Sequence, residues 1–134
     1  MKKIVLLSDT HGLLREEVRA LLAEADAVVH AGDFDTPEVA DALRACAEPH
    51  LVRGNNDGAW AEDLPRTLAF TIEGVRFFLA HNRRDVPRGL NGVDVVVCGH
   101  SHKYASEDRG GVLWLNPGGC GRRRFGLELT LCLM

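Results

Sequence analysis

The first half of the chain alternates short apolar runs with stretches whose apolar residues recur at helical spacing. The short runs are apolar at nearly every position, which is typical of strands that are buried on both faces of a sheet. The stretches between them place leucine, valine and alanine on one stripe, as amphipathic helices do. The pattern predicts, in chain order, a strand at 4–7, a helix at 13–25, a strand at 27–31, a helix that begins at Thr36-Pro37 and a strand at 50–53. This β-α-β-α-β order indicates parallel strands joined by right-handed crossovers.

The second half of the chain separates its apolar runs mainly by turns. Residues 67–72 and 76–80 flank Glu73-Gly74-Val75, which predicts a hairpin. Residues 93–98 form a further buried run, and Gly-rich turns then separate strands expected at 103–108, 112–115 and 127–133. Two sheets packed face to face, with helices outside, would bury all of these runs. We therefore expect a single α/β domain over residues 1–134 whose later part is mostly β.

Composition narrows the class of protein. The 46% hydrophobic and 26% charged residues are ordinary for a globular chain, and the longest apolar runs fall far short of the ~20 residues that span a bilayer. The amino-terminal lysines lead into only four apolar residues before Ser8-Asp9, which favours a strand over a signal peptide. The four cysteines form no CxxC pair, so we expect reduced thiols in the cytoplasm. Because the apolar runs are short, we expect no membrane partner. A net charge of -3 makes nucleic acid an unfavourable partner.

Polar clusters follow six of the predicted strands. They are, in chain order, Asp9-Thr10-His11-Gly12, Gly32-Asp33, Gly54-Asn55-Asn56-Asp57, His81, Gly99-His100-Ser101-His102 and Asn116-Pro117-Gly118-Gly119. Each cluster alone is an ordinary turn or helix cap. Ligands of open α/β sheets bind outside the carboxyl ends of the strands, so we expect the clusters to meet at one rim. Six fragments at six strand ends are hard to explain as separate turns.

The side chains expected at this rim carry the ligand atoms of a metal site. They are two carboxylates, one amide and four imidazoles: Asp9, His11, Asp33, Asn55, His81, His100 and His102. Oxygen and nitrogen donors without a thiolate suit Mn²⁺, Fe²⁺ or Zn²⁺. Seven ligands exceed the needs of one such ion. If one carboxylate bridges, they suffice for two ions that keep open positions for water and substrate.

The motifs "SDTHG", "AGD", "GNND", "GHSH" and "NPGG", in this order from Asp9 to Gly119, resemble the calcineurin-like metallophosphoesterase superfamily. The match is nearest to its small single-domain bacterial and archaeal phosphodiesterases. The resemblance implies a four-layer α/β/β/α sandwich of two mixed β-sheets flanked by helices. It also implies the role of each ligand: Asp9, His11 and His102 for the first metal, Asp33 as the bridge, and Asn55, His81 and His100 for the second metal. Asp33, Asn55 and His81 would be the catalytic residues.

The resemblance implies hydrolysis of small phosphate esters, phosphodiesters above all, by in-line attack of a hydroxide that bridges two divalent ions. Mn²⁺ is the expected metal, with Fe²⁺, Ni²⁺, Co²⁺ or Zn²⁺ as alternatives. The competing interpretation is a metal-binding scaffold of the same fold that binds proteins and catalyses little or nothing. Such a scaffold would not need all seven ligands, which favours the enzyme. Exposed strand edges are compatible with a homo-oligomer, and the sequence does not specify one.

Three positions depart from the usual motifs of the family. Asn56 stands where more distant members carry a histidine that assists leaving-group departure, which fits the small phosphodiesterases and predicts weak turnover unless the leaving group is good. Asn82 follows His81 where glycine is usual, and Gly119 replaces a frequent serine.

Residues near the motifs invite their own expectations. We expect Asp35 and Asp57 to orient ligands through hydrogen bonds, although Asp35 could equally cap a helix. Trp60 and Trp114 are expected to pack. The arginines beside the motifs are expected to be solvated rather than to bind substrate: Arg83, Arg84 and Arg122-Arg123-Arg124.

Overall fold

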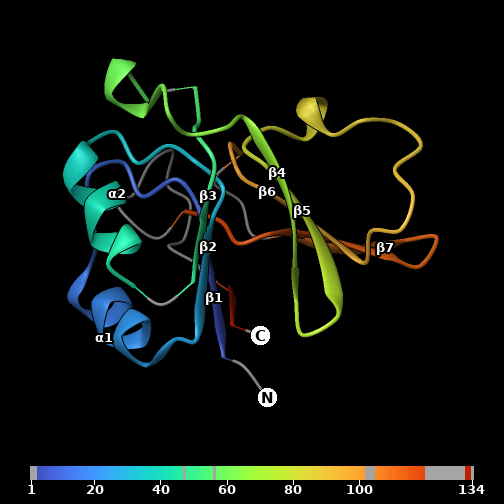
Figure 1. The fold of residues 1–134 in the computed structure, drawn as a ribbon, viewed down its shortest axis with the longest axis horizontal. Coiled ribbons are helices and arrows are strands. Elements are labelled where there is room, and N and C mark those ends of the chain that lie inside the picture. Colours follow the sequence, from blue (N-terminus) through green and yellow to red (C-terminus); the bar gives the residue numbers. More distant parts are fainter. Residues whose placement is uncertain (1–2, 47, 56, 102–104, 120–131, 134) are drawn as a thin grey trace.

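The computed structural model describes residues 3–46, 48–55, 57–101, 105–119 and 132–133 and is shown in Figure 1. The first sheet contains β1 (Ile4–Leu7), β2 (Ala27–His30), β3 (Pro49–Leu51) and β9 (Cys132–Leu133). The second contains β4 (Thr67–Ile72), β5 (Val75–Ala80), β6 (Val95–Cys98), β7 (Ala105–Arg109) and β8 (Val112–Asn116). The helices are α1 (Glu16–Glu24) and α2 (Pro37–Arg44), with the 3₁₀ helices η1 (Ala59–Ala61) and η2 (Arg83–Asp85).

The first sheet has the strand order β3-β2-β1-β9, and α1 and α2 cover its outer face (Figure 1). β1, β2 and β3 are parallel, whereas β9 runs antiparallel to β1. Side chains alternate between the two faces of β1, because Val5 and Leu7 pack against the helices while Ile4 and Leu6 face the second sheet. Both faces are therefore buried, as the continuous apolar runs predicted.

The second sheet has the order β4-β5-β6-β8-β7 and also mixes parallel with antiparallel pairs. Val95 and Val97 of β6 point toward the first sheet and form a shared core with Leu79 and Val29. This contact between two mixed sheets, with the helices outside, confirms the predicted fold class.

The outer face of the second sheet has a thinner cover. Phe78 and Val96 on this face pack against Val86, Leu90 and Val93 from the segment between β5 and β6. In the described part of the chain this segment is a loop that contains η2 and lies beyond the sheet on the side away from α1 and α2 (Figure 1). The carboxyl ends of β5, β6 and β8 consequently lie beside a loop.

Most element predictions are confirmed, with shifts at the ends. Thr36 is the N-cap of α2 and Pro37 lies in its first turn, as expected, although the Thr36 side chain makes no cap hydrogen bond. α1 starts at Glu16, later than predicted, because the polar segment after β1 forms turns instead of helix. β3 covers residues 49–51 and not 50–53, since Val52 and Arg53 already lead into the next polar loop. No helix in the described ranges is both long and apolar enough to cross a membrane.

Candidate metal centre

The structure brings together six of the seven side chains that the sequence nominates as ligands. Asp9 follows β1, Asp33 follows β2 and Asn55 follows β3, while His81 follows β5 and His100 follows β6. Each strand thus delivers a polar side chain at its carboxyl end, and the two sheets meet there. His102 lies outside the described residues, as does Asn56.

One group of ligand atoms is shut off from solvent. Asp9, His11 and Asp33 place potential ligand atoms within 4.8 Å of one another, and all three residues are at most 2% exposed. The Nε2 atom of His11 lies 3.9 Å from Asp9 Oδ1 and 3.9 Å from Asp33 Oδ2. On the other side of the ring, Nδ1 donates to Asp35 Oδ2 at 2.9 Å. This bond fixes the tautomer and leaves the Nε2 lone pair directed at the two carboxylates.

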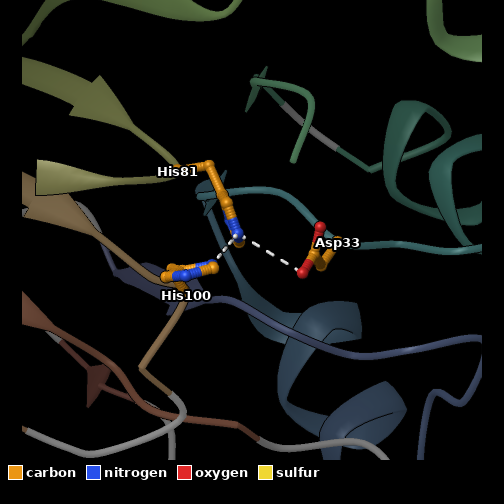
Figure 2. A group of neighbouring side chains, drawn as sticks. All are labelled: Asp33, His81 and His100. Carbon is orange, nitrogen blue, oxygen red and sulfur yellow. Dashed lines mark hydrogen bonds and ion pairs between the residues drawn. The ribbon is translucent and has the colours of Figure 1, made fainter. Parts of the chain in front are cut away.

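A second group lies on the side of the second sheet. The His81 Nε2 atom is 3.3 Å from Asp33 Oδ2, 2.8 Å from Asn55 Oδ1 and 3.2 Å from His100 Nδ1. Figure 2 shows the two imidazoles and the Asp33 carboxylate directed toward one another. The His81 ring donates from Nδ1 to the Ala31 carbonyl at 2.8 Å, so its neutral form presents a lone pair at Nε2.

The convergence of acceptors tests whether a metal fits. When His81 is neutral with its proton on Nδ1, a carboxylate oxygen, an amide oxygen and an imidazole lone pair approach one point, and none of them donates to the others. A divalent cation would satisfy all of them at once, and the donor set suits a metal of the Mn²⁺ to Zn²⁺ series. Burial by itself lowers the pKa of His81, but the hydrogen bond and negative charge of Asp33, with Asp9 and the Ala31 carbonyl, outweigh burial and raise it. The site therefore attracts positive charge.

Asp33 belongs to both groups. Its Oδ2 atom is 3.9 Å from His11 Nε2 and 3.3 Å from His81 Nε2, and these two rings come from different sheets. A Cβ added at Gly54 would overlap the Asp33 side chain and backbone, so only glycine permits this approach. Among the described residues, Asp33 is the residue common to both groups.

Backbone strain is concentrated at this rim. Seven non-glycine residues of the described ranges have a positive φ, and five of them are Asp9, His11, Asp33, Asp35 and His100. Such conformations typically cost about 1–3 kcal/mol each and persist where the surrounding structure imposes them. Their accumulation at the predicted ligands indicates a site in which function outweighs local stability.

Asp57 joins the loops that carry the ligands. Its Oδ2 atom accepts from the backbone N–H groups of Asp33 at 3.0 Å and Gly54 at 2.8 Å, and its Oδ1 atom accepts from that of Asp35 at 2.9 Å. Burial raises the pKa of Asp57, although these backbone bonds oppose the shift. The orienting role expected for Asp35 and Asp57 is thus present in the geometry, Asp35 acting on His11 and Asp57 on the loops.

Other supporting residues were missed or left ambiguous by the sequence. Ser8 Oγ donates to Asp9 Oδ2 at 2.7 Å, and its only sequence signal is a hydroxyl at the end of an apolar strand. His30 accepts from the Gly32 N–H at Nδ1 and donates from Nε2 to Thr10 Oγ1, with 3.0 Å for both. Complete burial, helped by His81, lowers its pKa to about 3. His30 is a neutral residue that braces the loops and faces no metal position.

Comparison with known proteins agrees with this geometry. The family model for the calcineurin-like phosphoesterase superfamily domain matches residues 1–134. The chain belongs to the calcineurin-like phosphoesterase superfamily. Within the superfamily it is 31% identical over 129 residues to a probable metallophosphoesterase of Methanothermobacter thermautotrophicus, covering 86% of this chain and 75% of that protein.

A second superfamily relative is phosphodiesterase YfcE of Escherichia coli, which is 32% identical over 145 residues, with 88% of this chain and 79% of YfcE covered. The solved structure of YfcE superposes with a TM-score of 0.78 at 27% identity over 98% of this chain and 84% of that one. Vps29 of Chaetomium thermophilum superposes with a TM-score of 0.85 at 20% identity, covering 100% of this chain and 82% of that one. The likeness to Vps29 shows a shared fold.

Proposed function

We propose that this protein hydrolyses small phosphodiesters with the aid of two divalent metal ions. The observation that carries the proposal is the position of Asp33 between two groups of ligands, one from each sheet. Membership of a superfamily with phosphodiesterase-named relatives supports the same reaction class.

The ligand set would leave the centre electropositive. Asp9 and Asp33 are the carboxylates among the proposed ligands, and Asn55 and the imidazoles are neutral ligands, so two dications would keep about half of their charge. When bound, the ions would supply a water of lowered pKa and would hold the non-bridging phosphate oxygens. Asp35 would keep the His11 ring oriented, and the Ala31 carbonyl would do the same for the His81 ring. Asn55, whose Oδ1 atom lies next to His81 Nε2, would be a ligand on the side that receives the substrate.

A metal titration with a chromogenic phosphodiester tests the proposal. We expect two equivalents of Mn²⁺ per chain and turnover of bis(p-nitrophenyl) phosphate that saturates with the second equivalent, with Fe²⁺, Ni²⁺, Co²⁺ and Zn²⁺ compared in parallel. Asp63→Asn, on an exposed carboxylate that pairs with Arg44, is a matched control for variants of the ligand carboxylates. One equivalent of metal at saturation, or turnover that is insensitive to chelation, would contradict it.

The competing function is a protein-binding scaffold that holds metal without catalysis. The fold similarity to Vps29 is compatible with either function, because a fold alone does not decide between them. The assembled ligand set, with its buried orienting partners, favours the enzyme. Metal binding without turnover of any phosphate ester across the five metals would favour the scaffold.

A further inference from the structure

An apolar pocket opens beside His100 on the outer face of the second sheet. It has a volume of about 200 Å³, and we call it the Trp114 pocket; its main lining residues are Asn82, Arg83, Cys98, His100, Ala105 and Trp114. His100 belongs to the candidate metal centre and Asn82 follows His81 directly, so the pocket adjoins the centre. A group attached to a phosphate held there can reach it.

The lining of the pocket combines neutral and aromatic side chains with the charged Arg83 and Glu107. Cys98 is buried and contributes a small apolar side chain to the lining. The Arg83 guanidinium lies 5.4 Å from the centre of the Trp114 ring, and that of Arg109 lies 5.0 Å from it. These two cations hold the indole in place. A planar guanidinium and an indole together are suited to pack against an aromatic ring.

The volume limits what the Trp114 pocket accepts. A cavity of about 150 Å³ lined by apolar side chains binds one benzene molecule, whereas sites for drug-sized ligands start near 300 Å³. At about 200 Å³ the pocket admits one ring system. Glu107 also lines it, and its charge is compensated by Arg109 at 3.1 Å.

A second pocket, of about 260 Å³, is polar and is lined by His81 and Asn55 of the candidate metal centre. Arg53, Arg66 and Asp85 line it, and Asn82 lines both pockets. Negative charge develops on the leaving oxygen during phosphate ester hydrolysis, and nearby guanidinium groups stabilise it. The leaving group therefore fits the polar pocket, which leaves the Trp114 pocket for the arm of the diester that stays on the phosphate.

We propose that the Trp114 pocket binds a planar aromatic group, either an aryl ring or a nucleobase, on the retained arm of the phosphodiester substrate. This inference rests on the proposed function and adds a specificity site to it. It gives a role to Asn82, which replaces the glycine usual after the histidine. The Asn82 side chain accepts from the Arg84 N–H at 3.0 Å and caps η2, whose first residue is Arg83. The packing role expected for Trp114 is also present, since it contacts the cluster around Phe78 and Val96.

The test holds the leaving group constant and varies the retained arm. The substrates are p-nitrophenyl ethyl phosphate, p-nitrophenyl phenyl phosphate and thymidine 5′-(p-nitrophenyl phosphate), each assayed with the Mn²⁺-loaded protein. We expect kcat/KM for the phenyl or the thymidine ester to exceed that for the ethyl ester by about tenfold, mainly through KM. A larger gain for the phenyl ester identifies an aryl arm, and a larger gain for the thymidine ester identifies a nucleoside.

The variants decide whether the Trp114 pocket causes the preference. Trp114→Leu and Arg83→Ala should each lower the ratio of aromatic to ethyl kcat/KM by about fivefold to tenfold. Arg84→Ala is the matched control, because Arg84 is also an exposed arginine of η2 but does not line the pocket, and it should keep the ratio of the parent protein. If Trp114→Leu fails to fold, the result for Arg83→Ala decides whether the Trp114 pocket causes the preference, because the Arg83 side chain is exposed.

Two results would overturn the inference while leaving the proposed function intact. One is equal kcat/KM for the three esters. The other is a preference that Trp114→Leu and Arg83→Ala both leave unchanged. Absence of turnover for all three esters would instead overturn the proposed function, and the inference with it.

Discussion

The two halves of the metal centre differ in their access to solvent. The half that carries Asp9 and His11 is at most 2% exposed, and its side chains are held by Ser8 and Asp35. The other half is buried at His81 but exposed at Asn55 and His100. Both pockets beside the centre border this open half. Under the proposed function, the buried half would maintain the geometry of the centre and the open half would receive the substrate.

Asp33→Asn should weaken metal binding in both halves of the centre and should cause the largest loss of activity. The amide keeps the shape of the side chain but loses the charge that two ions would share. We expect the loss of activity to exceed the roughly 10–100-fold that is typical when a residue outside the ligand set is changed. Metal content and turnover of bis(p-nitrophenyl) phosphate measure it, with Asp63→Asn as the control. A folded Asp33→Asn protein with two bound ions and full activity would contradict the bridging role.

Replacing one histidine in each half should separate stability from metal binding. Asparagine tolerates the positive φ that both His11 and His100 adopt, so His11→Asn and His100→Asn are a matched pair. In the metal-free protein we expect His11→Asn to lose roughly 2 kcal/mol of unfolding free energy, since it leaves a cavity and removes the bond to Asp35. His100→Asn, at an exposed site, should change it by no more than about 0.5 kcal/mol.

Urea unfolding with and without Mn²⁺ measures this contrast. Each variant should also lose the stabilisation that one bound ion gives the parent protein. Equal losses of unfolding free energy in the two metal-free variants would show that the buried half contributes no more to stability than the open half.

Asp57→Asn tests the link between the halves. The carboxylate accepts three backbone N–H groups, and an amide oxygen with one donor-only NH₂ group cannot replace both oxygens. We expect activity at limiting metal to fall about 10–100-fold, with partial recovery at high metal concentration. Asp63→Asn, at an exposed carboxylate that lines neither pocket, serves as the control. A loss of activity that no metal concentration recovers would indicate a different role.

The sequence predicted the parts of this site that depend on strand order, and missed those that depend on the approach of separate loops. Parallel strands deliver their carboxyl ends to one rim, so the convergence of Asp33 with His81 follows from the motifs and the topology. The three bonds of Asp57 depend on how near the loop after β3 comes to the loop after β2, and no spacing within the sequence encodes that distance. Trp114 lines a pocket because of the direction of its side chain on β8 and the conformation of the loop at Asn82. A single apolar position in the sequence predicts neither the direction of that side chain nor the conformation of that loop.

Asp35→Asn should have the smallest effect and should affect one half. Asparagine suits the positive φ of Asp35 and can still accept from His11 Nδ1, but it no longer offers a negative charge to that N–H group. We expect the affinity for the ion of the buried half to fall about tenfold, with the other ion bound as before. Calorimetric titration with Mn²⁺ resolves the two sites, and Asp63→Asn should leave both unchanged. An equal loss at both sites would mean that the halves are coupled more tightly than their separate orienting bonds indicate, because Asp33 would then transmit a change at His11 to His81.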